Sequence, residues 1–315
     1  MIHQMAPWVP QFIQSWKNHS QSFTPFTFAT LDMQSNRPKC RTVIFRDFLF
    51  HDKRSNVLTF TTDMRGDKVK EILGSGAETA PFEACFYFPS SWEQYRFSGR
   101  CFVVSRQSKP LISHAFNGAE HGTIEYPILS PSIYGDAHVL YQHEHVDEHG
   151  EDSEDDHVRN DVEHNGTCGD NEAEPDVAST RPELSRTSTR SSGPAAHHVV
   201  LTPAEYAPPT PKEWDLELTR QWANLSRSTK AQFRKPHPGS PVTSETSKQL
   251  DKIQRGVDGA KENTGFDNFG VVCLCIDEVD FLNLKDGRGG ERWRFSRHVE
   301  EDSHLESWIE EEVCP

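Results

Sequence analysis

The chain has 315 residues with 34% hydrophobic content, a mean hydropathy of −0.71 and a formal net charge of −15. This acidic balance argues against general nucleic-acid binding, because a protein that binds nucleic acid needs a positive surface opposite the phosphates. No apolar run approaches the length of a membrane span, and the N-terminus lacks a basic segment followed by an apolar one, so we expect neither a transmembrane helix nor a secretion signal.

The first predicted element is an amphipathic helix over residues 6–16. Trp8, Phe12 and Trp16 recur at four-residue spacing, and Pro7 suits the first turn of a helix. An aromatic stripe on one helix face can line a ligand site, but in most helices it packs against the core of a domain. We therefore assign these rings to the core.

Three strands and a short helix follow. Residues 26–31, 42–50 and 57–62 are rich in β-branched and aromatic residues and are predicted strands. Residues 68–73 have helical spacing before Gly74 ends the helix. The free N–H groups at a helix start suit a phosphate, and four nearby cations would strengthen such a site: Arg41, Arg46, Arg65 and Lys68. The alternative is a surface hairpin whose charges are solvated.

Two further strands are predicted at residues 83–88 and 92–105. Gly99 interrupts the second strand, which is typical of a bulge or a close backbone approach. Four or five antiparallel strands with few helices predict a closed or partly closed antiparallel barrel, mainly β with flanking helices. The second strand alternates between a polar side and an aromatic side, formed by Gln94, Arg96 and Ser98 and by Tyr95 and Phe97, respectively.

Residues 137–200 have low complexity. The part from 144 to 200 contains 15 acidic and four basic residues, so it carries −11 of the net charge of −15, and a Ser/Thr/Arg-rich run follows its acidic half. Such a composition buries too little apolar surface to offset the chain entropy, so we expect a long disordered insertion. Its six histidines between 138 and 164 could hold a transition metal loosely and its serines could be phosphorylated, but no regular spacing supports a site.

Ordered structure is expected to resume after the insertion. Residues 210–233 begin with a threonine cap followed by proline, as helices do, and carry a tryptophan-rich stripe. Residues 268–280 are predicted to form a buried strand, which residues 281–284 continue. Two further strands are predicted at residues 292–297 and 308–315. These strands have no other sheet to join, so we expect them to complete the first barrel. The prediction is one domain, formed by residues 1–136 and 201–315, that residues 137–200 interrupt.

The seven cysteines are scattered and include no Cys-x-x-Cys pair. Cys273 and Cys275 have strand spacing, with both thiols on one face. Reduced thiols in a cytoplasmic protein fit this pattern better than disulfides or zinc, and we assign no metal site.

Five ordered segments give the chain a family resemblance. Over roughly residues 6–105 and 202–315 it resembles the pyridoxamine 5′-phosphate oxidase family of FMN-binding split barrels, in a divergent branch of FMN-binding domain proteins. Each segment alone is weak, but their common order is specific. The segments are RTVIFR (41–46), FTTDMRGDK (60–68), WEQYRFSG (92–99), the tryptophan-rich helix through the PHPGSP turn (214–241), and the closing RWRF and WIEEEVCP strands.

The resemblance implies FMN as the cofactor. Arg41 and Lys68 would pair with the FMN phosphate with Arg65 close by, and Thr61 and Thr62 would contact the phosphate and ribityl chain. A homodimer with the flavin between its subunits is also implied.

Three further positions complete the implied cofactor set. Gln94 would hydrogen-bond the flavin ring, since an amide both donates and accepts, and Arg294 would lie near the ring. Arg46 replaces the family's lysine and keeps its charge. Because Arg41 and Arg46 are an odd number of positions apart, an ideal strand would point them to opposite faces. A bulge, or a role of Arg46 toward the substrate, would resolve this.

The chain departs from the family pattern at several positions. Gly66 replaces a serine of the phosphate loop, and Asp67 replaces an arginine, unless its carboxylate simply faces outward at the helix start. The Arg-x-His that binds the substrate phosphate aligns with Gly290 and Arg292, and Leu284 stands in place of a tryptophan. FMN binding therefore carries over better than activity on pyridoxamine phosphate.

Three functions remain open at the level of the sequence. The first is a flavin-dependent oxidoreductase of unknown substrate, in which FMN carries the hydride or electron chemistry and no side chain need be catalytic. The second is a non-catalytic FMN-binding or partner-binding module that has lost the oxidase substrate site. The third is a barrel that no longer binds FMN.

Overall fold

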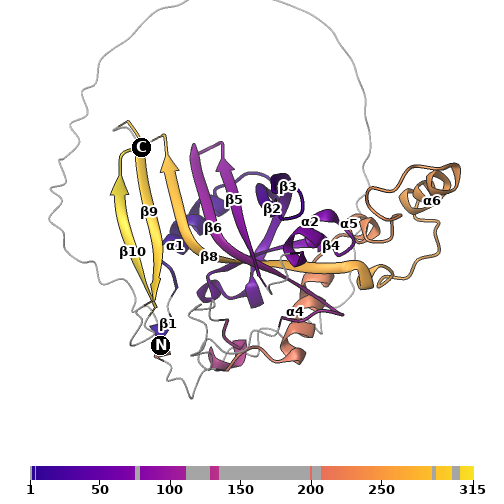
Figure 1. Cartoon of the computed structure of the whole chain (residues 1–315), viewed down its shortest axis with the longest axis horizontal. Helices are drawn as coiled ribbons and strands as arrows, with labels where there is room; N and C mark the ends of the chain where they lie inside the picture. The colour runs from indigo at the N-terminus through magenta and orange to yellow at the C-terminus, as the bar shows by residue number, and fades with distance from the viewer. Residues whose placement is uncertain are drawn as a thin grey trace, which may run out of the picture. The chain divides into compact units, whose positions relative to one another are not determined.

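The computed structural model describes residues 2–3, 5–74, 79–110, 128–134, 199–200, 207–285, 289–299 and 306–315, which all belong to one compact unit (Figure 1). The strands are β1 (Ile2–His3), β2 (Thr24–Asp32), β3 (Arg37–Phe48), β4 (Val57–Asp63), β5 (Ala80–Phe88), β6 (Glu93–Ser105), β7 (Val199–Val200), β8 (Phe269–Asn283), β9 (Glu291–Val299) and β10 (Glu306–Val313). The α-helices are α1 (Trp8–Lys17), α2 (Asp67–Leu73), α4 (Pro211–Ala223), α5 (Arg227–Gln232) and α6 (Ser244–Gln254).

Eight antiparallel strands form one sheet in the order β10-β9-β8-β4-β3-β2-β5-β6. An additional pairing of β8 with β6 closes the six strands from β8 to β6 into a barrel, and β9 and β10 extend from β8 beyond it. The prediction of a mainly β split barrel is thereby confirmed. Of the strands that follow the insertion, β8 completes the barrel begun by the strands before it, whereas β9 and β10, which were also expected to do so, extend the sheet beyond it.

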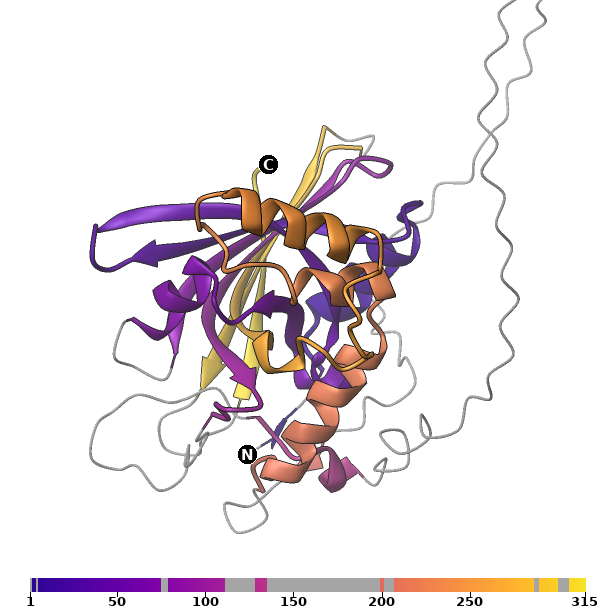
Figure 2. The ribbon, with the colours of Figure 1, turned by 90° about the vertical axis from the view of Figure 1, so that its right-hand side faces the viewer.

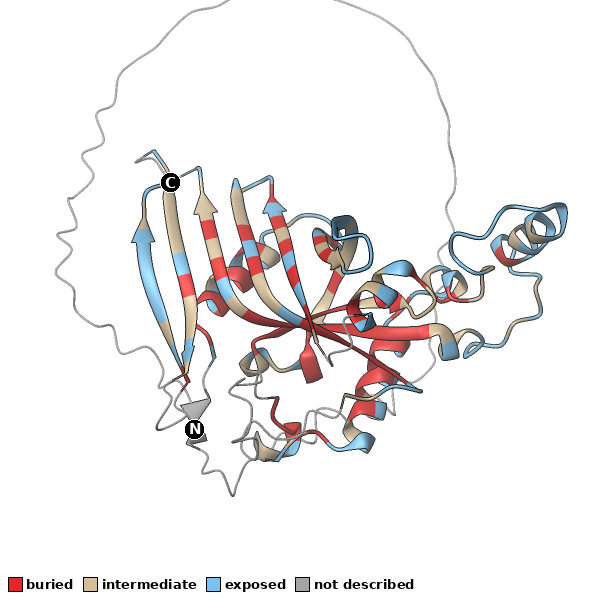
Figure 3. Cartoon of the chain, in the orientation of Figure 1, coloured by how far each residue is buried: buried red, intermediate tan, exposed pale blue. Residues whose placement is uncertain are grey.

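β8 has 15 residues and serves two parts of the sheet. Its first half, residues 269–275, lies between β4 and β6, and its second half pairs with β6 and β9. The change occurs at a bulge in β8, where Asp277 is the extra residue opposite the step from Ser98 to Gly99 in β6. A Cβ atom on Gly99 would overlap the carbonyl oxygen of Cys275, so the close backbone approach expected at this glycine is present. Figure 3 shows the buried first half of β8 and the more exposed β9 and β10.

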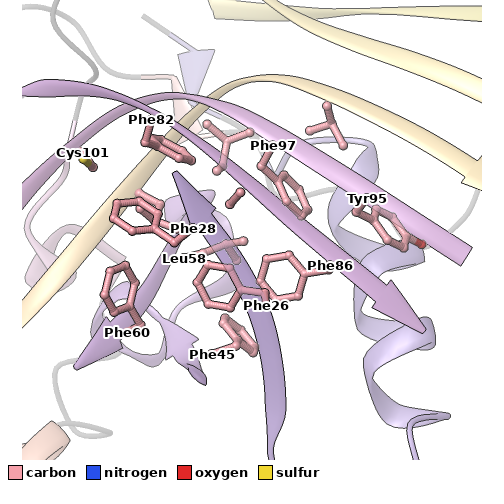
Figure 4. Packing of buried hydrophobic residues seen from close by; sticks show 14 of the residues in the cluster. Phe26, Phe28, Phe45, Leu58, Phe60, Phe82, Phe86, Tyr95, Phe97 and Cys101 are labelled. Carbon is pink, nitrogen blue, oxygen red and sulfur yellow. The ribbon is translucent and has the colours of Figure 1, made fainter. Parts of the chain in front are cut away.

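Aromatic rings fill the barrel interior. Phe26 stacks on Phe86 with centroids 4.2 Å apart, and Phe28 meets Phe60 edge-on at 4.9 Å (Figure 4). The first helix, α1, adds Phe12, which is fully buried and contacts seven further aromatic rings. The assignment of the aromatic stripe of α1 to the core is confirmed.

A second apolar cluster lies outside the barrel wall, where α4 covers β8 and β6 (Figure 2). Trp214, Leu218 and Trp222 of α4 pack there with the thiols of Cys273 and Cys275. Burial raises the pKa of both thiols well above the ordinary value, so they remain protonated members of the core.

The predicted continuous helix over 210–233 is wrong. α4 ends at Ala223, and α5 begins after Ser226, whose hydroxyl accepts a hydrogen bond from the backbone N–H of Thr229. The polar helix α6 was not predicted, because it buries only Ile253 and offers little apolar periodicity.

The insertion expected at residues 137–200 lies outside the described residues except for Val199 and Val200, which pair with Ile2 and His3 as β7 and β1. Among the helices that the structure describes, none combines the length and apolar character needed to cross a membrane.

Candidate functional site

A β-bulge in β3 places Arg46 on the outside of the barrel. The register of β3 against β4 shifts between Phe45 and Asp47, so Arg46 is the extra residue. Its Nε donates to the hydroxyl of Thr61 at 3.3 Å, on the face of β4 opposite the buried ring of Phe60. The expected bulge exists, but it does not turn Arg46 toward the barrel face on which Arg41 lies.

Arg46 lies in a cleft of about 200 Å³ between β2, β3 and α4. Trp16, Phe23, Gln221 and Asn224 also line this cleft. Burial lowers the pKa of the Arg46 guanidinium. Within the described part of the chain no carboxylate comes within 4.0 Å of it, because the neighbouring Asp47 pairs with Arg220 and His51. A half-buried cation without an acidic partner is suited to an anionic ligand.

Lys68 and Arg41 form a second group of cations, beside α2. Arg41 lies opposite Phe28 on the inner face of β3, donates to the hydroxyl of Thr30 at 2.6 Å and pairs with Glu71 of α2. The ammonium of Lys68 has neither a hydrogen bond nor a carboxylate within 4.0 Å among the described residues. Burial, followed by the positive charge of Arg41, lowers the pKa of Lys68. An anion between these two side chains would relieve both effects.

Gly66 and Asp67, the two positions at the start of α2 that differ from the family pattern, have different surroundings. Gly66 is the N-cap of α2 without a side-chain cap, and a Cβ atom placed on it would lie 3.7 Å from Nζ of Lys68. Asp67 points outward, with 82% of its side chain exposed, and its carboxylate accepts a hydrogen bond from Nζ of Lys70 at 2.9 Å. The carboxylate at position 67 is therefore turned away from the Lys68 ammonium.

Arg65 and Thr62 face other partners. The Arg65 guanidinium donates to both carboxylate oxygens of Asp63, at 2.9 and 2.7 Å, and this hydrogen bonding raises its pKa. It also reaches the carbonyl of Phe233 beyond α5 at 3.4 Å. Thr62 is buried, and its hydroxyl contacts the carbonyl of Asp63. These two residues support the turn before α2 and present no free charge.

Gln94 and Arg294 lie on the outer face of the sheet made by β5, β6, β8 and β9. The side chain of Gln94 makes no hydrogen bond to any described residue, and no described carboxylate lies within 4.0 Å of Arg294. Arg294 opens onto a cleft of about 510 Å³ that Arg292 and Asp280 also line. Arg292 donates to both oxygens of Asp280, at 2.9 and 2.7 Å, and holds the pKa of that carboxyl below its usual range.

The two parts of the candidate site are far apart within one chain. Thr61 pairs with Val271 at the start of β8, whereas Gln94 pairs with Leu282 near its end. The eleven steps from position 271 to position 282 span about 36 Å of extended strand. A single flavin cannot bridge the Arg46–Thr61 group and Gln94 along this wall.

Sequence reasoning missed the polar face of α4. Glu217, Arg220 and Gln221 are buried against β3 and β4, and Gln221 donates to the hydroxyl of Thr59 at 3.0 Å. Their positions at i, i+3 and i+4 mark one helix face, distinct from the tryptophan stripe, and this spacing was the available signal.

Comparison with known proteins places the chain in a family. Residues 5–105 match the family described as "Pyridoxamine 5′-phosphate oxidase, FMN-binding domain". The chain is also 48% identical over 325 aligned residues to the uncharacterized protein YGR017W of Saccharomyces cerevisiae, with complete coverage of both chains. The chain belongs to the pyridoxamine 5′-phosphate oxidase-related family of FMN-binding domains.

Two more distant members of this family agree with the assignment. The pyridoxine/pyridoxamine 5′-phosphate oxidase 2 of Arabidopsis thaliana is 32% identical over 103 residues, which are 32% of this chain and 48% of the plant protein. The crystal structure of a pyridoxamine 5′-phosphate oxidase-related, FMN-binding protein from Nostoc punctiforme PCC 73102 superposes with a TM-score of 0.52 at 19% identity, with 98% of each chain covered. This second likeness supports the split-barrel fold.

Proposed function

We propose that this protein binds FMN and acts as a flavin-dependent oxidoreductase. The observation that carries the proposal is the pair of half-buried cations, Lys68 and Arg46, that have no carboxylate partner among the described residues. Burying a charge without a counter-ion costs free energy, so both positions favour a bound anion. When bound, FMN supplies the hydride or electron transfer, and the chain's own residues bind and orient it.

Five of the predicted residues have surroundings that fit a role in binding FMN. Lys68 and Arg41 hold the phosphate, while Glu71 keeps the Arg41 guanidinium in place. Arg46 and the hydroxyl of Thr61, on the outside of the barrel, bind oxygens of the ribityl chain. The free Gln94 amide is available for the polar edge of the flavin ring.

We further propose that two copies of the chain share each flavin. The separation of Thr61 from Gln94 along β8 supports this arrangement, because one copy would hold the phosphate and the other would contact the ring with Gln94 and Arg294. The large exposed face of β5, β6, β8 and β9 is the surface on which the second copy would lie.

Flavin absorbance tests the cofactor assignment. The purified protein, incubated with FMN and passed through gel filtration, is expected to retain the visible flavin bands. Lys68→Ala and Arg46→Ala should weaken FMN binding by roughly tenfold or more, since each removes a charge-assisted contact. Lys70→Ala, which removes an exposed cation paired with Asp67, is the matched control and should bind normally. Failure of the unaltered protein to retain or titrate with FMN would refute the proposal.

A mixing experiment tests the shared site. Lys68→Ala and Gln94→Ala each damage a different part of the site, so a dimer containing one copy of each has one intact site and one doubly damaged site. Random exchange of equal amounts should restore wild-type affinity to about one quarter of the sites. No recovery after verified subunit exchange would mean that each chain binds flavin alone.

A non-catalytic flavin-binding module is the second candidate. It is favoured by Arg292, which is tied to Asp280 and not free for a substrate phosphate, and by Leu284 in place of the family's tryptophan. Anaerobic addition of pyridoxamine 5′-phosphate or of reduced nicotinamide to the flavin-loaded protein separates the candidates. Bleaching of the flavin bands supports the oxidoreductase, whereas inertness toward both classes of donor supports the module.

A further inference from the structure

Three exposed apolar side chains gather around Gln94. Tyr87 at the end of β5, Trp92 before β6 and Leu284 after β8 are 53%, 54% and 51% exposed, respectively. Single exposed apolar side chains are ordinary, but several that lie together mark an interaction or ligand site.

The strand register puts apolar side chains on one face with Gln94. Tyr87 and Leu282 are the direct cross-strand neighbours of Gln94 on either side. Tyr87 and Leu282 therefore share the outer face with the amide. Trp92, in the turn before β6, and Leu284, just after β8, lie at the end of this row of side chains. The backbone N–H of Leu284 donates to the carbonyl of Trp92 at 3.2 Å and fixes the two segments together.

Trp92 has a backbone conformation that is energetically unfavourable for a tryptophan. Its φ is 57°, the left-handed region that glycine and asparagine adopt readily and bulky side chains avoid. The position closes the turn between Phe88 and Glu93, which are partners across the hairpin. Turn chemistry alone would select glycine or asparagine here, so the indole is retained against the local preference. Such positions concentrate at ligand sites.

We propose that Trp92 and Tyr87 form an aromatic platform for the isoalloxazine ring of FMN. This inference rests on the proposed function and on the shared site, with the phosphate held by the second copy. Isoalloxazine is a flat ring system with an apolar end and a hydrogen-bonding edge. The aromatic rings of Trp92 and Tyr87 stack on the flat face of the flavin ring, and Leu282 and Leu284 extend this apolar contact. The Gln94 amide hydrogen-bonds the polar edge of the ring.

Trp92→Asn tests the platform without weakening the fold. Asparagine tolerates the left-handed backbone, so the thermal midpoint should stay the same or rise. FMN should bind on the order of tenfold more weakly, the range found for aromatic stacking on a planar base. Flavin fluorescence, which a stacked indole quenches, should increase in the bound state. Trp92→Phe should keep most of the affinity.

Val257→Thr is the matched control away from this sheet face. Val257 is 62% exposed and follows α6, outside both the platform and the cleft of Arg294. We expect its FMN affinity and its fluorescence to match the unaltered protein. Wild-type affinity and quenching in Trp92→Asn would overturn the platform while leaving FMN binding intact. Loss of the dimer in Trp92→Asn but not in Val257→Thr, with wild-type quenching of the flavin that remains bound, would also overturn it and assign the patch to subunit contact. Absence of FMN binding in the unaltered protein would defeat the proposed function itself.

Discussion

Lys68 is the residue whose protonation most directly controls the proposed phosphate site. Its pKa is lowered by burial and by the charge of Arg41, so the ammonium loses its proton below the ordinary value of 10.5. The positive charge is therefore lost as the pH rises through this lowered pKa.

We expect FMN affinity to fall at alkaline pH, before free lysine would titrate. Lys68→Arg keeps its charge throughout this range, so its affinity should stay flat where that of the unaltered protein declines. Dissociation constants measured from neutral to alkaline pH for both proteins check this. Parallel curves would mean that another group controls the decline.

Gly66→Ser should strengthen the site. The backbone at Gly66 has φ −75°, which any residue adopts, and the new side chain would start 3.7 Å from Nζ of Lys68. The carbonyl of Asp63, 3.3 Å away, must shift slightly. The hydroxyl supplies a phosphate donor and a helix cap, so FMN binding should tighten and the free energy of unfolding should rise by a few tenths of a kcal/mol. Gly66→Ala, which lacks the hydroxyl, should neither bind FMN more tightly nor gain free energy of unfolding. FMN titration and denaturant unfolding of both variants check this.

At this scale the sequence indicates charges but not their partners. The cations of the 41–68 segment could be read directly, and Arg65 with Asp63 is a local pair. Arg41 is neutralised by Glu71, thirty residues away, and that pairing depends on how α2 lies against β3. The sequence left open whether a bulge or a role toward the substrate explains the position of Arg46. Only the register of β3 against β4 shows that the bulge is present.

Among the elements, α4 joins the barrel through a buried ionic network. The Arg220 guanidinium donates to both oxygens of Glu217, at 2.8 and 2.7 Å, and to Asp47 beside the bulge at 2.8 Å. Both Arg220 and Glu217 are buried, so neither charge has water as a substitute partner.

Arg220→Met should destabilise the protein by about 3–5 kcal/mol, because it leaves the Glu217 carboxylate buried without a counter-ion. Denaturant unfolding measures the loss. Thr219→Ala, on the exposed side of the same helix, is the control and should change little. Adding Glu217→Gln to Arg220→Met should recover part of the stability, and no recovery would show that lost packing dominates.

Strand positions were largely predictable, because alternation and β-branched composition are local signals. The division of 210–233 into α4 and α5 was missed because the tryptophan stripe continues through Leu225 and Phe233, which both pack in the same cluster. Apolar periodicity reports burial, and here two short helices bury one continuous surface.

For the whole molecule, the insertion interrupts the chain without interrupting the barrel. Residues 1–144 and 196–315 form one compact unit, and β7 at the end of the insertion pairs with β1. Replacing residues 137–198 by a short Gly/Ser linker should therefore preserve both the thermal midpoint and the affinity for FMN. Calorimetry and FMN titration check this, and a weaker FMN affinity at an unchanged midpoint would assign the insertion a part in the site.

The position of β8 also determines when this protein can fold in the cell. The barrel needs β8 between β4 and β6, yet β8 ends 178 residues after Ser105, the last residue of β6. A ribosome takes roughly 10–40 s to add that length of chain. Throughout that interval the nascent chain presents two unpaired strand edges and a phenylalanine-rich interior, which are the features that cause aggregation. Biosynthesis should therefore depend on chaperones that hold the first five barrel strands until the sixth emerges.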